Sequence, residues 1–253
     1  MKNTSCKHRV RAGLLAGIFL ASISIAASPV RAEFIGLVTV TATNSHGSAS
    51  ANFNPLSHLP PQAQVPERVR LMLAEKFKMR SQGEVIGTID ELIIDMDGDP
   101  VVQLTFGATS GSSDTTFSIT STVVAFDPLS FPTAEATMNG TLTDTGNDGA
   151  SLSSTSGLFQ ALYNGDTTFA SLVGGVNGGA GSVTEFGQLL GPMEIDGDVD
   201  SIQGIVQFTL SADDTVSGVG RFEVTPQIPE PSTFVLLGIA AVGLLIRTRR
   251  RQR

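Results

Sequence analysis

The sequence has no tryptophan, one tyrosine and one cysteine among its 253 residues. The cysteine, Cys6, lies in an N-terminal segment that we expect to be removed, so the mature protein should have no thiol. This excludes disulfide bonds, cysteine metal clusters and cysteine nucleophiles together. With Tyr163 as its one tyrosine, the chain also has few of the amphipathic rings on which sugar-binding platforms usually rely.

Positive charge is scarce between the two ends of the chain. All 24 Asp and Glu lie between Glu33 and Glu230, where only six Lys and Arg occur, so this segment has a formal charge of −18. Nucleic acid and anionic lipid surfaces are poor partners for it, because their phosphates need Lys and Arg to neutralise them. An acidic surface favours solubility, mutual repulsion and the attraction of cations.

Histidine is scarce as well. Once the N-terminal segment is removed only His46 and His58 remain, both in Pro-, Ser- and Asn-rich sequence without a nucleophile-elbow motif. A Ser or Thr nucleophile usually needs a His base beside it. We therefore expect a protein that is not an enzyme, and a secreted hydrolase using one of these histidines is the least favoured alternative.

The first 32 residues have the three parts of a secretory signal peptide. A basic start is followed by a 16-residue, mostly apolar run at 12–27 and by the small-residue site Val30-Arg31-Ala32. This order predicts cleavage by signal peptidase between Ala32 and Glu33. A retained membrane anchor is the alternative, but the run is shorter than the roughly 20 residues that a spanning helix needs.

The C-terminal end begins with a Pro-Glu-Pro segment and an apolar run. Pro229, Glu230 and Pro231 should be extended, because proline fixes its own φ and biases the preceding residue away from helix. Residues 234–246 are 13 residues without charge, and they give the short transmembrane helix that we predict at 233–246. At about 1.5 Å per residue they span about 20 Å of a hydrocarbon core of about 30 Å, which suits temporary insertion.

Arginines follow the apolar run to the end of the chain. They are Arg247, Arg249, Arg250, Arg251 and Arg253. By the positive-inside rule this stop-transfer tail stays in the cytoplasm and the acidic body lies outside.

These three ordered elements, paired with a signal peptide, resemble the PEP-CTERM sorting signal over about 25 of the 253 residues. The resemblance implies recognition by an exosortase, a membrane-embedded cysteine protease or transpeptidase of Gram-negative bacteria that make exopolysaccharide. The protein would be held transiently in the inner membrane, lose its tail, and be released or attached at the cell surface. An ordinary single-pass anchor with a proline-rich stalk is the alternative.

The body, residues 33–228, has short runs in which apolar and polar residues alternate. We predict strands at 33–42, 101–106, 116–126, 204–210 and 218–224. Turn signals separate such runs at Asp97-Gly98, Asp148-Gly149, Asn164-Gly165 and Asp196-Gly197. This pattern indicates an all-β fold, an antiparallel β-sandwich ectodomain between an N-terminal signal helix and a short C-terminal transmembrane helix.

Three stretches of the body are less regular. Residues 54–66 contain four prolines and are predicted to be a loop or linker. Residues 67–80 leave two structures open, because their composition favours a helix and their alternation favours a strand; we lean slightly to helix. Residues 171–191 include the sequence SLVGGVNGGAGS and are predicted to be a flexible loop.

Two sets of aspartates are candidate calcium ligands. They are Asp95, Asp97 and Asp99, and Asp196, Asp198 and Asp200. On a turning loop such spacing can converge carboxylates on Ca²⁺, whereas on a strand it spreads them along one face. Neither set matches an EF-hand, because Pro100 or Ser201 stands where that loop has Gly. Turn-forming Asp-Gly pairs on a soluble surface are the alternative explanation.

The sequence therefore predicts three parts: a signal peptide at 1–32, an acidic ectodomain at 33–228 and a sorting signal at 229–253. We expect a non-enzymatic, exported surface or matrix protein linked to exopolysaccharide and biofilm. Its processing partners would be signal peptidase and exosortase. A calcium- or carbohydrate-binding adhesion module is the main alternative.

Overall fold

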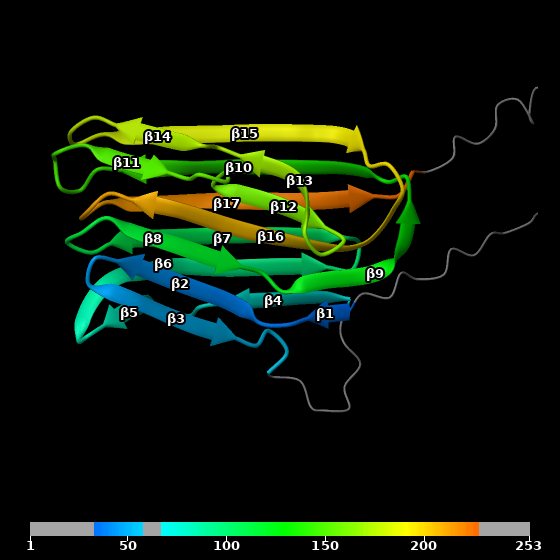
Figure 1. The fold of residues 1–253 in the computed structure, drawn as a ribbon, viewed down its shortest axis with the longest axis horizontal. Helices are drawn as coiled ribbons and strands as arrows, with labels where there is room; N and C mark the ends of the chain where they lie inside the picture. Colours follow the sequence, from blue (N-terminus) through cyan, green and yellow to red (C-terminus); the bar gives the residue numbers. More distant parts are fainter. Residues whose placement is uncertain (1–32, 58–66, 228–253) are drawn as a thin grey trace, which may run out of the picture.

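The structure is a computed structural model that describes residues 33–57 and 67–227. Two antiparallel sheets pack face to face, with their strands along the long axis of the body (Figure 1). The predicted all-β sandwich is confirmed. The predicted signal peptide, the transmembrane segment and His58 lie outside the described residues.

Sheet A has ten strands and is organised around β16. Its strands are β1 (Glu33–Ile35), β2 (Val38–Asn44), β3 (Gly47–Phe53), β8 (Thr115–Thr120), β9 (Val123–Ser130), β11 (Ala150–Ser153), β12 (Phe159–Tyr163), β13 (Thr167–Leu172), β14 (Gly175–Gly178) and β16 (Asp198–Leu210). The main path runs β1-β9-β16-β8-β2-β3, and β11 and β12 pair with other parts of β16.

Sheet B has seven strands in the order β15-β10-β17-β7-β6-β4, with β5 also paired to β6. Its strands are β4 (Arg68–Met72), β5 (Phe77–Ser81), β6 (Glu84–Asp97), β7 (Val101–Ser110), β10 (Thr133–Thr143), β15 (Val183–Glu194) and β17 (Thr215–Thr225). Because β4 and β5 pair with opposite halves of β6, they form one interrupted edge.

The core lies between the two sheets and is filled by alternate residues of their strands. Phe208 of β16 lies at its centre, with its ring centroid 5.5 Å from that of Phe106 and 5.4 Å from that of Phe117. All three rings are fully buried. Burial of a side chain of this size contributes roughly 1.5–3 kcal/mol, so the phenylalanines account for much of the packing between the sheets.

One close approach in the core depends on glycine. A Cβ added to Gly220 of β17 would lie 2.5 Å from the ring of Phe159 on β12. No other residue leaves room for that ring, because every other side chain begins with a Cβ. Gly220 therefore lets sheet B approach the β12 part of sheet A.

The predicted strands and turns are found where the sequence placed them. The windows 101–106, 204–210 and 218–224 lie within β7, β16 and β17. The windows 33–42 and 116–126, predicted as single strands, are each divided in two, into β1 and β2 and into β8 and β9. The turn at Asn164-Gly165 joins β12 to β13, and both residues have positive φ angles, of 49° and 91°. Asn and Gly adopt this left-handed conformation more readily than other residues.

The predicted helix at 67–80 is wrong. The segment forms β4 and β5, both hydrogen-bonded to β6, and its alternation buries Val69 and Met79. Pairing with a long neighbouring strand outweighed a helix propensity of a few tenths of a kcal/mol per residue. The partner strand, β6, was not among the predicted windows.

The predicted flexible loop at 171–191 is also wrong. Most of it belongs to β13, β14 and β15, and β15 pairs with β10 over nearly its whole length. Backbone hydrogen bonds to a neighbouring strand need no side chain, so glycine weakens a strand without forbidding it. The sequence alone did not show that β10 was available as a partner.

The two ends of the described body lie at the same end of the sandwich (Figure 1). Glu33 pairs with Ala125, which pairs with Ser201 near the start of β16. Thr225, at the end of β17, pairs with Thr133 at the start of β10. The loops that precede β10 and β16 are hydrogen-bonded to each other through Phe131 N–H and the Gly197 carbonyl, 2.9 Å apart.

Candidate functional site

The first aspartate set is divided between a strand and a turn. Asp95 lies on β6, and its Oδ1 is 3.8 Å from Arg68 and 3.6 Å from Arg70 on β4. Asp97 ends β6, and its Oδ1 accepts the N–H of Asp99 at 3.2 Å. Asp95 thus pairs with cations across the edge of sheet B, and Asp97 stabilises the turn into β7.

The second set surrounds the start of β16. Asp196 is in the turn before the strand, while Asp198 and Asp200 lie on it. Asp198 accepts a hydrogen bond from the Ser130 hydroxyl at 2.6 Å, and Asp200 accepts one from the Ser201 hydroxyl at 2.9 Å. Asp198 and Asp200 thus each have their own hydroxyl partner.

Within residues 33–57 and 67–227, no three acidic or histidine side chains are grouped to hold a metal ion. The six aspartates are therefore not brought together as the loop hypothesis required. The calcium site stays a prediction from sequence. A rise in the melting temperature of the protein in millimolar Ca²⁺ would support it.

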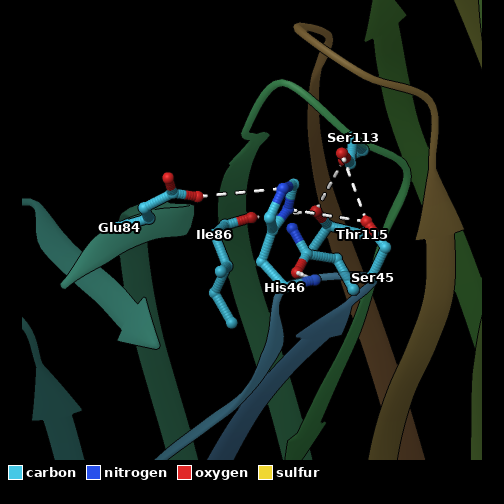
Figure 2. A network of polar contacts seen from close by, with 7 residues as sticks. Ser45, His46, Glu84, Ile86, Ser113 and Thr115 are labelled. Carbon is cyan, nitrogen blue, oxygen red and sulfur yellow. Dashed lines mark hydrogen bonds and ion pairs between the residues drawn. The ribbon is translucent and has the colours of Figure 1, made fainter. Parts of the chain in front are cut away.

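His46 lies in the turn between β2 and β3, within a small polar network (Figure 2). Its Nδ1 is 3.5 Å from Ser45 Oγ, and its Nε2 is 3.8 Å from Glu84 Oε2. Ser45 Oγ is also 3.5 Å from Ser113 Oγ in the β7–β8 loop. That loop is held by Thr115, whose hydroxyl donates to the carbonyl of Ile86 at 2.8 Å.

The arrangement of Ser45, His46 and Glu84 differs from a hydrolase triad in three ways. In a triad the nucleophile contacts Nε2 and the acid contacts Nδ1, whereas Ser45 and Glu84 use the opposite nitrogens. Both distances are longer than a strong hydrogen bond. The His46 side chain is also 45% exposed. The geometry favours a surface network that links three loops, and the prediction of a non-enzyme stays a prediction.

Asp144 and Asp214 are two buried carboxyl groups that the sequence analysis missed. They lie at the end of the sandwich opposite the described chain ends (Figure 1). Asp144 accepts the N–H groups of Asn147 at 2.8 Å, Gly149 at 3.0 Å and Gly181 at 2.6 Å. It therefore connects the β10–β11 and β14–β15 loops. The Gly- and Asn-rich turn after Asp144 was the available signal, since Asp often caps such turns.

The two carboxyl groups have opposite pKa shifts. Burial raises the pKa of Asp214, and the adjacent Asp144 carboxyl raises it further, against the effect of the Ser211 hydroxyl. Burial also acts to raise the pKa of Asp144, but the backbone N–H groups that it accepts outweigh burial and lower the pKa below 3.8. The Asp144 oxygens accept backbone N–H groups, and the Asp214 oxygens accept the Thr145 N–H and the Ser211 hydroxyl. The pair therefore organises loops rather than presenting carboxylates to a substrate.

A shallow groove crosses the outer face of sheet B. We call it the sheet B groove and define it by the cross-strand row Glu91, Gly107, Ser217, Thr141 and Glu185. Two adjoining depressions of about 460 and 680 Å³ lie along this row. Five strands at about 4.8 Å spacing make the row about 19 Å long.

The chemistry of the groove is that of hydroxyls between two carboxylates. The Thr141 and Ser217 hydroxyls are hydrogen-bonded at 2.9 Å on its floor, and Asn139 lines one side. Glu91 and Glu185 stand at the two ends of the row, and beyond Glu91 the larger depression continues to the ion pair of Lys76 and Asp90, 2.8 Å apart. The groove can therefore offer hydrogen bonds to a neutral or cationic chain and would repel an anionic one. No sequence motif marks it, because its residues come from five strands.

The described body ends close to the C-terminal elements. β17 finishes at Thr225, and the family model for the PEP-CTERM protein-sorting motif matches residues 227–251. The chain carries a PEP-CTERM sorting motif. The matched range includes the predicted Pro229, Glu230 and Pro231 and all of the predicted tail except Arg253, which all lie outside the described residues.

The PEP-CTERM motif makes this an exported protein that passes through the membrane and is processed by an exosortase. No curated protein matches the chain. In the part of the chain that the structure describes, no helix is long and apolar enough to cross a membrane. The family match thus covers the motif and not the sandwich.

Proposed function

We propose that the protein is a non-catalytic surface or matrix component of a Gram-negative envelope, delivered by signal peptidase and exosortase. The observation that carries this proposal is the PEP-CTERM motif directly after β17. Cleavage between Ala32 and Glu33 would leave β1 as the start of the mature protein. Loss of the tail would then release the sandwich or attach it at the cell surface.

The short connection supports processing next to a folded body. Three residues separate Thr225 from Pro229, and the four residue-to-residue steps allow at most about 14 Å of extended chain. β1, which begins at Glu33, lies at the same end of the sandwich at which β17 finishes (Figure 1). Both export signals therefore attach to one end, and the end that holds Asp144 faces away from the membrane before processing.

Mass spectrometry of the mature C-terminus tests the sorting step. We expect cells with exosortase to yield a chain that ends near residue 229, and cells without it to retain Arg253. Glu230→Ala should impair processing, whereas Pro226→Ala, just outside the matched range, should leave it intact. An intact Arg253 in both strains would contradict the proposal.

A second candidate function is glycan binding in the sheet B groove. Its hydroxyl floor, its length of about 19 Å and its terminal carboxylates suit an extended neutral oligosaccharide. Calorimetry should therefore show binding of a neutral β-linked hexasaccharide and none of an oligouronate. Ser217→Phe should remove binding by filling the floor, while Thr39→Phe on the outer face of sheet A should not. Equal binding by both variants, or none by the native protein, would reject this candidate.

A further inference from the structure

The two edges of sheet B differ in charge and in regularity. One edge is β15, a 12-residue strand that pairs with β10 alone among the strands described. Its Val183 and Leu189 side chains are 65% and 58% exposed. An exposed edge strand carries a row of backbone N–H and C=O groups that another strand can pair with.

The opposite edge, formed by β4, β5 and the loop between them, is basic. It holds five of the six Lys and Arg between Glu33 and Glu230: Arg68, Arg70, Lys76, Lys78 and Arg80. Met72, at the end of β4, is 60% exposed. This is the basic edge of an otherwise acidic body, whereas the charged residues of β15 are Glu185 and Glu194.

The strand register aligns the two edges. One cross-strand row starts at Arg70, passes through Asp95, Gln103, Arg221 and Thr137, and ends at Leu189. A parallel row starts at Met72 and ends at Gly187, and a third starts at Lys78 and ends at Val183. A simple translation along these rows would place Met72 of one copy beside Gly187 of the next.

The direction of the strands also fits such a translation. Successive neighbours from β15 to β4 are antiparallel, so with six strands on this path β15 and β4 run in opposite directions. When β15 of one copy meets β4 of the next, the new pair is again antiparallel. The exposed apolar side chain of Met72 in one copy then lies on the same face as that of Leu189 in the other copy, in the neighbouring cross-strand row.

We infer that copies of this protein associate head to tail, with the β15 edge of one copy paired to the β4–β5 edge of the next. Arg68 and Arg70 pair with Asp95 and Lys76 pairs with Asp90 within sheet B, so Lys78 and Arg80 are the basic side chains that complement the acidic and neutral β15 edge. Pairing of two β4–β5 edges would oppose like charges. Because the interface joins two different surfaces, it leaves a free edge at each end. The product is a linear polymer in which sheet B is continuous.

Engineered disulfides test this inference in the exported full chain on intact cells. Directly opposed residues of paired antiparallel strands have Cα atoms about 4.5–5.5 Å apart, within the range that a disulfide spans. The double variant Leu189→Cys/Arg70→Cys should give a ladder of multimers on a non-reducing gel after oxidation. Val183→Cys/Lys78→Cys should give the same ladder, which protects the test against one variant that fails to fold.

Single variants and charge reversal separate the alternatives. Leu189→Cys and Arg70→Cys alone should give no ladder, and Thr39→Cys/Arg70→Cys should give none because Thr39 is on sheet A. Adding Arg68→Glu and Lys78→Glu to the first double variant should reduce the ladder about tenfold or more, since opposed like charges disfavour an interface. Dimers from Leu189→Cys alone would show pairing of two β15 edges and overturn the inference. Absence of multimers from both double variants would overturn it as well.

Discussion

Sheet B presents one face to sheet A and the other to solvent, and the same strands build both faces. On the inner face of β17, Gly220 lies against the ring of Phe159, and the buried Phe222 stacks on Phe169 with ring centroids 5.4 Å apart. On the outer face, Ser217 and its neighbours Thr141 and Gly107 leave the floor of the sheet B groove open. Alternate residues of each strand thus face either sheet A, where their packing sets stability, or solvent, where they can contact a ligand. Substitutions on the two faces should therefore have different effects.

The largest effect should come from the centre of the inner face. Phe208→Ala removes a fully buried ring that packs between Phe106 and Phe117, and it should lower the free energy of unfolding by about 3–5 kcal/mol. Urea denaturation measures the loss. Phe131→Ala is the matched control: its ring is exposed, and the change should be about 0.5 kcal/mol or less. Similar losses of stability at both positions would show that the Phe208 ring does not pack between the two sheets.

Overpacking the inner face should have a smaller effect. Gly220→Ala places a methyl group against the Phe159 ring and should cost about 1–3 kcal/mol. Phe159→Leu in the same chain should recover part of that loss by making room. Gly174→Ala is the control, since an added Cβ there meets nothing within 4 Å. A Gly220→Ala variant as stable as the native protein would refute the close approach of the two sheets.

The paired carboxyls at the end of the sandwich should give opposite dependences on pH. The pKa of Asp144 is lowered on folding, so its ionised form stabilises the protein above the ordinary pKa of 3.8, and this contribution is lost as pH falls through the folded pKa. The stability difference between native protein and Asp144→Asn should therefore be present at pH 6 and shrink below pH 3.8.

Asp214 should behave in the reverse way. Its pKa is raised on folding, so its contribution is fully present below pH 3.8 and is lost as pH rises through the folded pKa. The Asp214→Asn variant should therefore gain stability relative to the native protein across that rise. Denaturation curves from pH 3 to 7 measure both trends, and parallel curves for both variants would contradict the assigned pKa shifts.

The smallest effect on stability should come from the outer face. Ser217→Phe fills the sheet B groove, yet Ser217 is exposed, so the free energy of unfolding should change by about 0.5 kcal/mol or less. Urea denaturation of the variant measures its stability, and calorimetry with the glycan on the same sample measures its binding. A large loss of stability would show that the outer face is also packed.

Local patterns predicted the parts of the fold that depend on local physics. The alternation in β7, β16 and β17 and the turns at Asp-Gly and Asn-Gly were sufficient, because side-chain direction and turn conformation depend on neighbouring residues. The helix prediction for residues 67–80 was wrong, because the structure of this segment depends on hydrogen bonds to β6. The same is true of residues 171–191, where a Gly-rich sequence is typical of a loop but β14 pairs with β11 and β15 pairs with β10.

The candidate sites divide in the same way. The sorting motif could be found because its order of proline, apolar and basic residues is contiguous. The pairing of Asp144 with Asp214 could not be found, because its members lie 70 positions apart in the chain. The sheet B groove is distributed over five strands, so neither its length nor its terminal glutamates have a sequence signature.

By itself, the sequence determined that the protein is exported, carries a PEP-CTERM motif, and has an acidic body built of short strands. These properties follow from composition and from contiguous order. Only the tertiary structure decided which strands became edges, which glycines faced rings, and which carboxylates met. Strand pairing joins residues distant in the chain, and the free energy of each contact depends on a partner that no local pattern identifies.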